Sequence, residues 1–365
     1  MGFKCGIVGL PNVGKSTLFN ALTSTAQAAA ENYPFCTIEP NVGQVPVPDP
    51  RPARLAELAK SARVLPAVMT FVDIAGLVRG AAAGEGLGNR FLSHIREVDA
   101  VAHVLRCFED ENVTHVEGRV DPLADAETVE TELMLADLES LERRLAPLEK
   151  RFQGGEKALK PQVELMREVL ELLRRGRPAR ALAPGPEKAK AFRELQLLTG
   201  KPVLYVANVG EADAATGNDA SRKVDAMAAA QGAGAVVVSG RIEAELAGLD
   251  ADERKLFLTD LGLAEPGLDR LIRAGYALLD LITFFTAGPK EAHAWTVPRG
   301  TRARAAAGSI HSDFERGFIA VETIGYDDYV AAGGEQKAKE SGRMRLEGAD
   351  YAVRDGDVLL FRFNV

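Results

Sequence analysis

The sequence has few cysteines and no long apolar segment. Its three cysteines are Cys5, Cys36 and Cys107, an odd number without a C-x-x-C pair, which argues against a disulfide framework and against a zinc site. No apolar run approaches the length needed to span a bilayer, and the N-terminus lacks a signal-peptide pattern. We therefore expect a soluble, cytoplasmic protein that has no membrane partner.

The 365-residue chain also lacks an overall excess of basic residues. Its formal net charge is −8, which disfavours indiscriminate binding to nucleic acid. The charge is unevenly distributed, because residues 143–193 contain 14 Lys/Arg against 6 Asp/Glu, a local balance of +8 that leaves −16 on the remainder. A basic segment on an acidic body indicates a specific polyanionic partner.

The strongest chemical signal lies close to the N-terminus. Residues 9–16 read G-L-P-N-V-G-K-S and match the phosphate-binding loop pattern G-x-x-x-x-G-K-[ST]. A strand-like run precedes the loop and a helix-like run follows it, so backbone N–H groups and a helix N-terminus would surround a phosphate. Lys15 would reach the β- and γ-phosphates, and Ser16 would bind Mg²⁺. The nucleotide-binding residues predicted here are Asn12, Val13, Gly14, Lys15, Ser16 and Thr17.

Two further segments follow in the order that nucleotide switches use. The proline-bounded loop 31–40 contains Thr37, whose hydroxyl is our candidate to complete the Mg²⁺ shell. The β-rich run 67–72 ends at Asp73, and Gly76 follows it. We expect Asp73 to support the Mg²⁺ from behind its direct ligands, and Gly76 to make a backbone contact with the γ-phosphate. D-x-x-G is weak alone, but the strand context and the position after the phosphate loop strengthen it.

The glutamine that orients the attacking water in Ras-like enzymes is missing. Leu77 occupies its position after Gly76, so hydrolysis needs another polar group or a partner. His103 falls inside an apolar strand pattern, for which we expect a structural role. His115 lies in a polar loop, and its ring could either face the phosphates or remain solvated.

The pattern that recognises guanine is altered. A strand-like run at 202–207 leads into N-V-G-E at 208–211, where guanine-binding switches have N-K-x-D. Because Glu211 is one methylene longer than aspartate, it cannot occupy the same position, and the base preference is expected to move towards ATP. A second strand-like run, 235–238, ends at Ser239, which would contribute a contact to the base. The predicted base-binding residues are Asn208, Val209, Glu211 and Ser239.

From residue 127 the apolar pattern becomes helical. Apolar residues three and four apart run from Leu138 to Phe152 and again from Leu159 to Leu173, with a Gly-Gly turn between the two runs. This spacing predicts an antiparallel coiled-coil hairpin with basic residues on its outer faces. The hairpin is either a solvated helical prop or an arm for RNA or the ribosome. Aromatic strand-like runs after about residue 279 predict a small α+β domain. Its arginines and aromatic residues could bind RNA, or they could equally form its core and a solvated edge.

Together these motifs resemble one family, the Obg-related, ribosome-associated P-loop ATPases known as the YchF or Obg-like ATPase family. The likeness extends over P-F-C-T-I-E-P-N, D-I-A-G-L and N-V-G-E, and through 284–301, 310–319 and 355–365. It implies an α/β fold with three parts: a P-loop nucleotide-binding domain at 1–125 and 200–278, a coiled-coil insertion at 126–199, and a ubiquitin-like TGS domain at 279–365. One departure is S-G-R at 239–241, where the family commonly has S-A-K, so contacts there would differ.

The resemblance also implies a function. The family hydrolyses ATP in preference to GTP and associates with the ribosome, and its proposed water-orienting histidine matches His115. In related hydrolases the asparagine equivalent to Asn12 helps to hold K⁺. We therefore expect a ribosome-linked ATPase switch that uses Mg²⁺, with Lys15 and His115 as catalytic residues and with the ribosome or its large subunit as partner. The alternatives are a GTPase of the same architecture and an RNA- or ribosome-binding protein for which nucleotide is a structural ligand.

Overall fold

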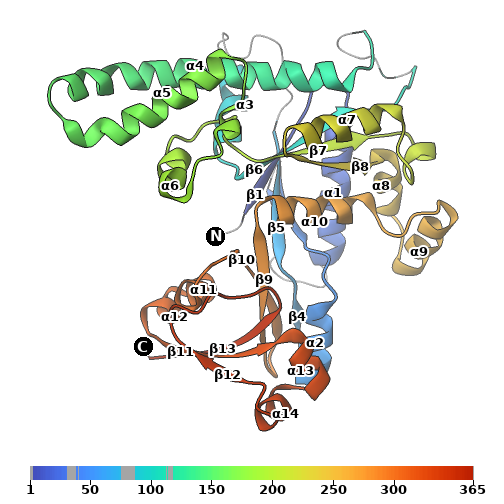
Figure 1. The fold of residues 1–365 in the computed structure, drawn as a ribbon. Helices are drawn as coiled ribbons and strands as arrows, with labels where there is room; N and C mark the ends of the chain where they lie inside the picture. The colour runs from blue at the N-terminus through green and yellow to red at the C-terminus, as the bar shows by residue number, and fades with distance from the viewer. Residues whose placement is uncertain are drawn as a thin grey trace.

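Two β-sheets organise the chain in the computed structural model, which describes residues 3–30, 38–39, 41–74, 87–111, 113 and 118–364 (Figure 1). The first sheet has the strand order β2-β3-β5-β1-β6-β7-β8. Strands β5, β1, β6, β7 and β8 are parallel, so their carboxyl ends meet at one edge of the sheet. The bounds are β1 Lys4–Val8, β2 Ile38–Glu39, β3 Val42–Pro46, β5 Val68–Asp73, β6 Ala100–Arg106, β7 Val203–Asn208 and β8 Gly234–Val238.

Helices cover the first sheet, which explains why β6 and β7 are apolar along almost their whole length and buried at every residue. Helices α7 and α10 pack against β7 and β8, and α1 packs against β3 and β5. Within the described ranges, no helix is both long and apolar enough to cross a membrane. The bounds are α1 Lys15–Ala30, α3 Leu87–Arg96, α7 Asp219–Ala230, α8 Gly240–Leu246, α9 Ala251–Asp260 and α10 Gly267–Leu278.

A pair of long helices extends from the first sheet (Figure 1). Helix α4 (Pro122–Gln153) and helix α5 (Lys160–Arg174) pack side by side and are followed by α6 (Pro186–Glu194). Asp121 caps α4 by accepting a hydrogen bond from the Ala124 N–H at 3.2 Å, and the helix continues through Pro147. The apolar residues of the predicted seam belong to one hydrophobic cluster between the helices: Leu138, Leu141, Leu145, Leu148, Phe152, Leu159, Val163, Met166, Leu170 and Leu173.

The second sheet has the strand order β12-β11-β13-β9-β10-β4. Most of it comes from the C-terminal part of the chain, but β4 (Val64–Leu65) lies in the range 1–125, which the family resemblance assigns to the nucleotide-binding domain. This strand pairs with β10, and the preceding helix α2 (Arg51–Ala59) packs on β9 and β10. The remaining bounds are β9 Leu281–Ala287, β10 Ala292–Pro298, α11 Ala303–Ile310, α12 Ser312–Arg316, β11 Phe318–Gly325, α13 Tyr326–Ala332, α14 Glu335–Glu340, β12 Arg345–Glu347 and β13 Asp357–Phe363.

A buried carboxylate on α4 attaches the helical pair to the first sheet. Asp137 is 1% exposed and accepts three hydrogen bonds, from the Leu198 N–H at 2.9 Å, the Thr199 N–H at 2.8 Å and the Thr199 hydroxyl at 2.7 Å. Burial raises the pKa of Asp137, and these donors oppose that shift because they stabilise the ionised form. The chain is therefore fixed to α4 a few residues before it enters β7.

We expect Asp137→Ala to lower the free energy of unfolding by about 3 kcal/mol, because three buried donors lose their acceptor. Urea denaturation followed by circular dichroism measures this loss. The matched control is Glu139→Ala, which removes an exposed carboxylate from the same helix and should change stability by less than about 0.5 kcal/mol. Equal stability of the two variants would show that Asp137 is not the attachment point.

Candidate functional site

The phosphate loop lies between β1 and α1 and depends on two residues with left-handed backbone conformations. Asn12 has φ +63° and Gly14 has φ +91°. Asparagine tolerates this region, whereas at Gly14 any side chain would also collide, since a Cβ there would lie 2.2 Å from Asn208 Nδ2. The loop then enters α1, where the Leu18 N–H donates to the Gly14 carbonyl at 3.0 Å. Its shape therefore requires the glycine that the motif specifies.

The side chain of Asn208 holds the phosphate loop in place from the end of β7. It is 4% exposed, donates through Nδ2 to the Val13 carbonyl at 2.8 Å, and accepts the Gly240 N–H at 2.9 Å. The sequence predicts a contact between Asn208 and the base. In the structure its amide is committed first to the phosphate loop and to the start of α8, so a base contact would be additional to these two bonds.

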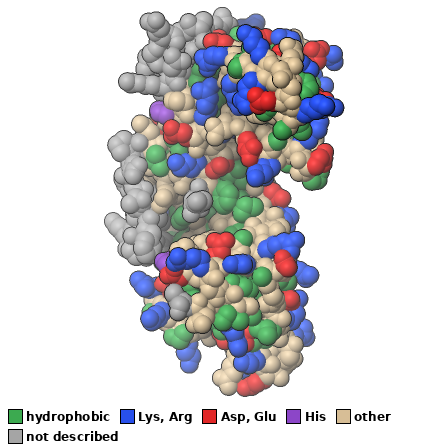
Figure 2. Space-filling view, turned by 90° about the vertical axis from the view of Figure 1, so that its left-hand side faces the viewer, with side chains coloured by type: hydrophobic (Ala, Val, Ile, Leu, Met, Phe, Trp, Pro, Cys, Tyr) green, Lys and Arg blue, Asp and Glu red, His purple; other side chains and the backbone are tan. Residues whose placement is uncertain are grey.

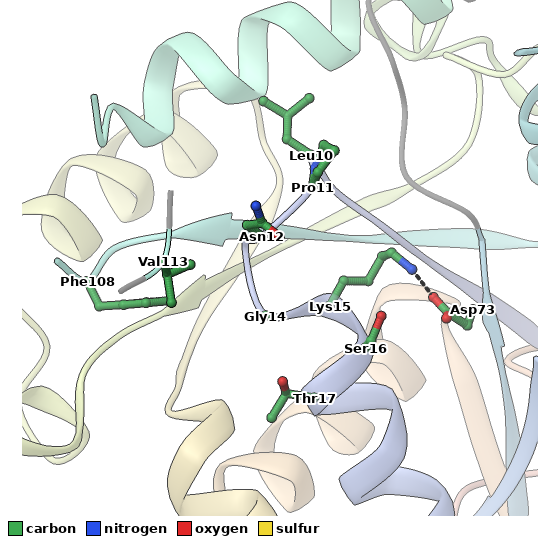
Figure 3. A pocket seen from close by; sticks show the side chains of 10 residues that line it. All are labelled: Leu10, Pro11, Asn12, Gly14, Lys15, Ser16, Thr17, Asp73, Phe108 and Val113. Atoms are coloured by element: carbon green, nitrogen blue, oxygen red, sulfur yellow. Dashed lines mark hydrogen bonds and ion pairs between the residues drawn. The ribbon is translucent and has the colours of Figure 1, made fainter. Parts of the chain in front are cut away.

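A cavity of about 700 Å³ lies over the phosphate loop (Figure 3). Four parts of the chain line it: the phosphate loop, the first turn of α1, the end of β5 and the segment that follows β6. Figure 3 shows Lys15 and Asp73 on one side of this cavity and Phe108 with Val113 on the other. The lining residues are Leu10, Pro11, Asn12, Gly14, Lys15, Ser16, Thr17, Asp73, Phe108 and Val113.

Lys15 and Asp73 form an ion pair inside this cavity (Figure 3). Their side chains are 10% and 16% exposed, so each charge offsets much of the desolvation of the other. A bound phosphate would compete with Asp73 for the ammonium group. The Ser16 hydroxyl and the Asp73 carboxylate line the same cavity, and such oxygen atoms are the ligands that Mg²⁺ prefers. These residues therefore fit a magnesium-bound polyphosphate.

The ends of β7 and β8 carry the other predicted base contacts. Val209 is buried and its N–H donates to the Val238 carbonyl at 2.9 Å, which joins the two strand ends. Glu211 forms an ion pair with Arg241, with 2.5 Å between Oε1 and Nε. Ser239 is 3% exposed, and within the described part of the chain its hydroxyl has no hydrogen-bond partner.

The structure brings together most of the predicted phosphate and metal residues, whereas three predicted site residues cannot be placed. Thr37, Gly76 and His115 lie outside the described residues, as does Leu77. The predicted structural role of His103 fits its position in β6, where it is 4% exposed and burial lowers its pKa to about 3. No sequence motif pointed to Phe108 or Val113. The available signal was Arg106, a charged residue at the end of a largely apolar strand.

Two family models match the chain. One is described as a 50S ribosome-binding GTPase and matches residues 4–136. The other, YchF-GTPase_C, is described as a protein of unknown function and matches residues 281–364. The first match includes the phosphate loop and β1 to β6, of which β4 belongs to the second sheet, and the second match includes β9 to β13 of the second sheet.

Relatives and a solved structure match over the whole length. The chain is 56% identical over 365 residues to the ribosome-binding ATPase YchF of Haemophilus influenzae, and each chain is covered completely. It is 51% identical over 367 residues to the protein of that name from Bacillus subtilis, again with complete coverage. The solved structure of the Schizosaccharomyces pombe YchF GTPase superimposes with a TM-score of 0.90 at 36% identity, covering 99% of this chain and 98% of that one. On its sequence, its phosphate loop and its complete fold, this chain belongs to the YchF family.

Proposed function

We propose that this protein is an ATPase that binds the ribosome and hydrolyses ATP to ADP and phosphate. The cavity over the phosphate loop carries this proposal, because Lys15, Ser16 and Asp73 line it together. The relatives from Haemophilus influenzae and Bacillus subtilis, which share half or more of its residues, are named as ribosome-binding ATPases. A ribosomal partner also supports a cytoplasmic location. Nucleotide-controlled contact with the ribosome would make the protein a translation-linked or stress-linked switch.

In the proposed mechanism, the ammonium group of Lys15 leaves Asp73 and binds the β- and γ-phosphates, while backbone N–H groups from Asn12 to Thr17 surround them. Ser16 and Thr37 would hold Mg²⁺, with Asp73 behind them. The ion would neutralise charge on the phosphate oxygens. Gly76 would contribute a backbone N–H to the γ-phosphate. Because Leu77 cannot orient water, His115 would do so, and turnover would stay slow until the ribosome completes the site.

The finer assignments of the fold and its ligands are also proposals. We propose a nucleotide-binding domain at 1–125 and 200–278, a coiled-coil hairpin at 126–199 that corresponds to α4 and α5, and a ubiquitin-like TGS domain at 279–365. K⁺ would bind near Asn12, which lies within the phosphate loop and has a positive φ. The segment α2–β4 would remain attached to the third unit, since it pairs with β10.

The ribosome, or its large subunit, would meet the helical pair and the TGS-like unit, with RNA as the contacted polyanion. In the region of the helical pair, fewer basic side chains are unpaired than the composition alone indicates. Eight of the 14 basic residues between 143 and 193 have a carboxylate partner. Figure 2 shows basic and acidic side chains next to each other over this region at the top of the view. An RNA phosphate that binds one of these paired residues would therefore have to displace its carboxylate partner.

Replacing Lys15 tests the catalytic proposal. We expect Lys15→Ala to lower ribosome-stimulated ATP turnover by about 10²- to 10³-fold, because the charge on the transferred phosphate loses its main protein cation. Phosphate release measured with and without purified ribosomes gives the result. Lys4→Ala, which removes an exposed lysine from β1, is the control and should retain full turnover. If ribosomes fail to stimulate the unchanged protein, nucleotide is a structural ligand and the ATPase proposal is wrong.

The base preference depends on Glu211. We expect calorimetric titration in Mg²⁺ and K⁺ to give tighter binding of ATP than of GTP, and we expect Glu211→Asp to shift the ratio towards GTP by about tenfold. The control is Glu245→Asp, since Glu245 lies 3.9 Å from the same Arg241 but further along α8. Tighter binding of GTP by the unchanged protein would instead support the GTPase alternative.

The role of His115 separates binding from turnover. We expect His115→Ala to lower ribosome-stimulated kcat by about 10²-fold, as loss of a water-orienting group does, and to leave the Kd for ATP unchanged within about twofold. Single-turnover kinetics and equilibrium titration measure the two quantities. His94→Ala removes an exposed histidine from α3 and serves as the control. Full turnover in His115→Ala would rule out this histidine.

A further inference from the structure

Arg106 is the largest of the fully buried side chains, although it is charged. It ends β6, is 2% exposed, and pairs in register with Asn208 of β7, the residue that holds the phosphate loop. A buried guanidinium is costly unless its donors are satisfied. The acceptors of its hydrogen bonds therefore show which part of the chain Arg106 stabilises.

The donors of Arg106 converge on the segment that follows β6. Nε donates to the Phe108 carbonyl at 3.1 Å, and Nη1 donates to the Val113 carbonyl at 2.8 Å. Nη2 donates to the Asp110 carbonyl at 3.3 Å. The guanidinium carbon also lies 4.7 Å from the centre of the Phe108 ring, within the range of a cation–π contact. One side chain thus fixes three backbone positions and one aromatic ring.

Two of these residues form part of the proposed nucleotide site. Phe108 and Val113 line the 700 Å³ cavity opposite Lys15 and Asp73 (Figure 3). Phe108 also follows directly on Cys107, whose N–H donates to the carbonyl of Asn208, one of the predicted base contacts, at 2.8 Å. The Cys107 carbonyl in turn accepts a hydrogen bond from Asn218 at 2.8 Å. The segment is therefore attached to the sheet at its start and to Arg106 along its length.

We propose that Arg106 is a positioning residue that holds Phe108, Asp110 and Val113 as a preformed wall of the nucleotide cavity, against which the base of the nucleotide packs. The identity of the ligand rests on the proposed function. The positioning of the segment by Arg106 does not depend on it. The planar guanidinium serves three carbonyls at once, and a lysine ammonium at this position cannot reproduce that fork. A wall fixed before binding lowers the entropy that the ligand must remove from the loop.

The structural part is tested without nucleotide, by hydrogen exchange of the full-length protein and of Arg106→Lys. We expect faster amide exchange at 108–113 in the variant, with unchanged protection in β6 and β7. The control is Arg254→Lys, because Arg254 also donates to two carbonyls, those of Leu246 and Ala247, outside the phosphate-loop cavity. Unchanged exchange at 108–113, or faster exchange throughout the sheet, would overturn the positioning role whether or not the protein is an ATPase.

The ligand part is tested by a double-mutant cycle on binding of Mg·ADP, which avoids turnover. We expect Arg106→Lys and Phe108→Leu each to weaken binding by about tenfold, and the double variant to weaken it by about tenfold also, because Phe108 is useful only while Arg106 positions it. Arg254→Lys should bind normally. A hundredfold loss in the double variant means independent roles and overturns the proposal, and so does normal binding by both single variants.

The wall can also be tested without a variant, and its failure can be distinguished from failure of the proposed function. If Arg106→Lys does not fold, the wall is tested in the unchanged protein, where Mg·ADP should protect the 108–113 amides at least as strongly as those at 14–18; no added protection overturns the proposal. Failure of the proposed function has a different signature. In that case the unchanged protein binds nucleotide and responds at 108–113 but shows no ribosome-stimulated release of phosphate.

Discussion

The amide of Asn208 donates to the Val13 carbonyl and accepts the Gly240 N–H, so one buried side chain fixes the phosphate loop, the end of β7 and the start of α8 relative to one another. Each bond contributes only about 1 kcal/mol to stability, but together they determine the position of the loop. The close approach explains why residue 14 must be glycine, because a Cβ there would overlap the amide nitrogen. The loop is therefore shaped by a residue almost 200 positions away in the sequence.

Two cations lie at the same edge of the first sheet, and the difference between their partners supports the different roles that we propose for them. Lys15 is paired with the carboxylate of Asp73, a partner that a phosphate would replace in the proposed mechanism. Arg106 is bound by neutral carbonyls of its own chain, for which a ligand does not compete. The first contact is exchangeable and suits a group that meets substrate. The second is permanent and suits a group that holds a wall in place.

The sequence predicted those parts of the site whose chemistry is local. A phosphate loop is a continuous motif, so Lys15, Ser16 and the need for glycine at 14 follow from eight adjacent residues. The spacing of apolar residues likewise predicted the packing of α4 against α5. Contacts between distant segments could not be obtained in this way. The bond from Asn208 to Val13 and the position of Phe108 opposite Lys15 depend on strand order, which a single sequence does not encode in any short pattern.

The contact between the two sheets could not be predicted from the sequence either, because it also joins distant segments of the chain. Between β3 and β5 the chain leaves the first sheet, and β4 joins the second sheet beside β10. Arg51, at the start of α2, also binds the C-terminal part of the chain. It forms an ion pair with Asp355 at 2.7 Å, and its guanidinium carbon lies 5.0 Å from the centre of the Phe285 ring.

Only two residues separate β4 from β5, and extended residues advance about 3.3 Å each, so β5 has little freedom to slide. Strand β5 is consequently held at one end by β4 on the second sheet and at the other by the pair between Asp73 and Lys15. The C-terminal sheet is thus part of the support that positions Asp73 in the cavity.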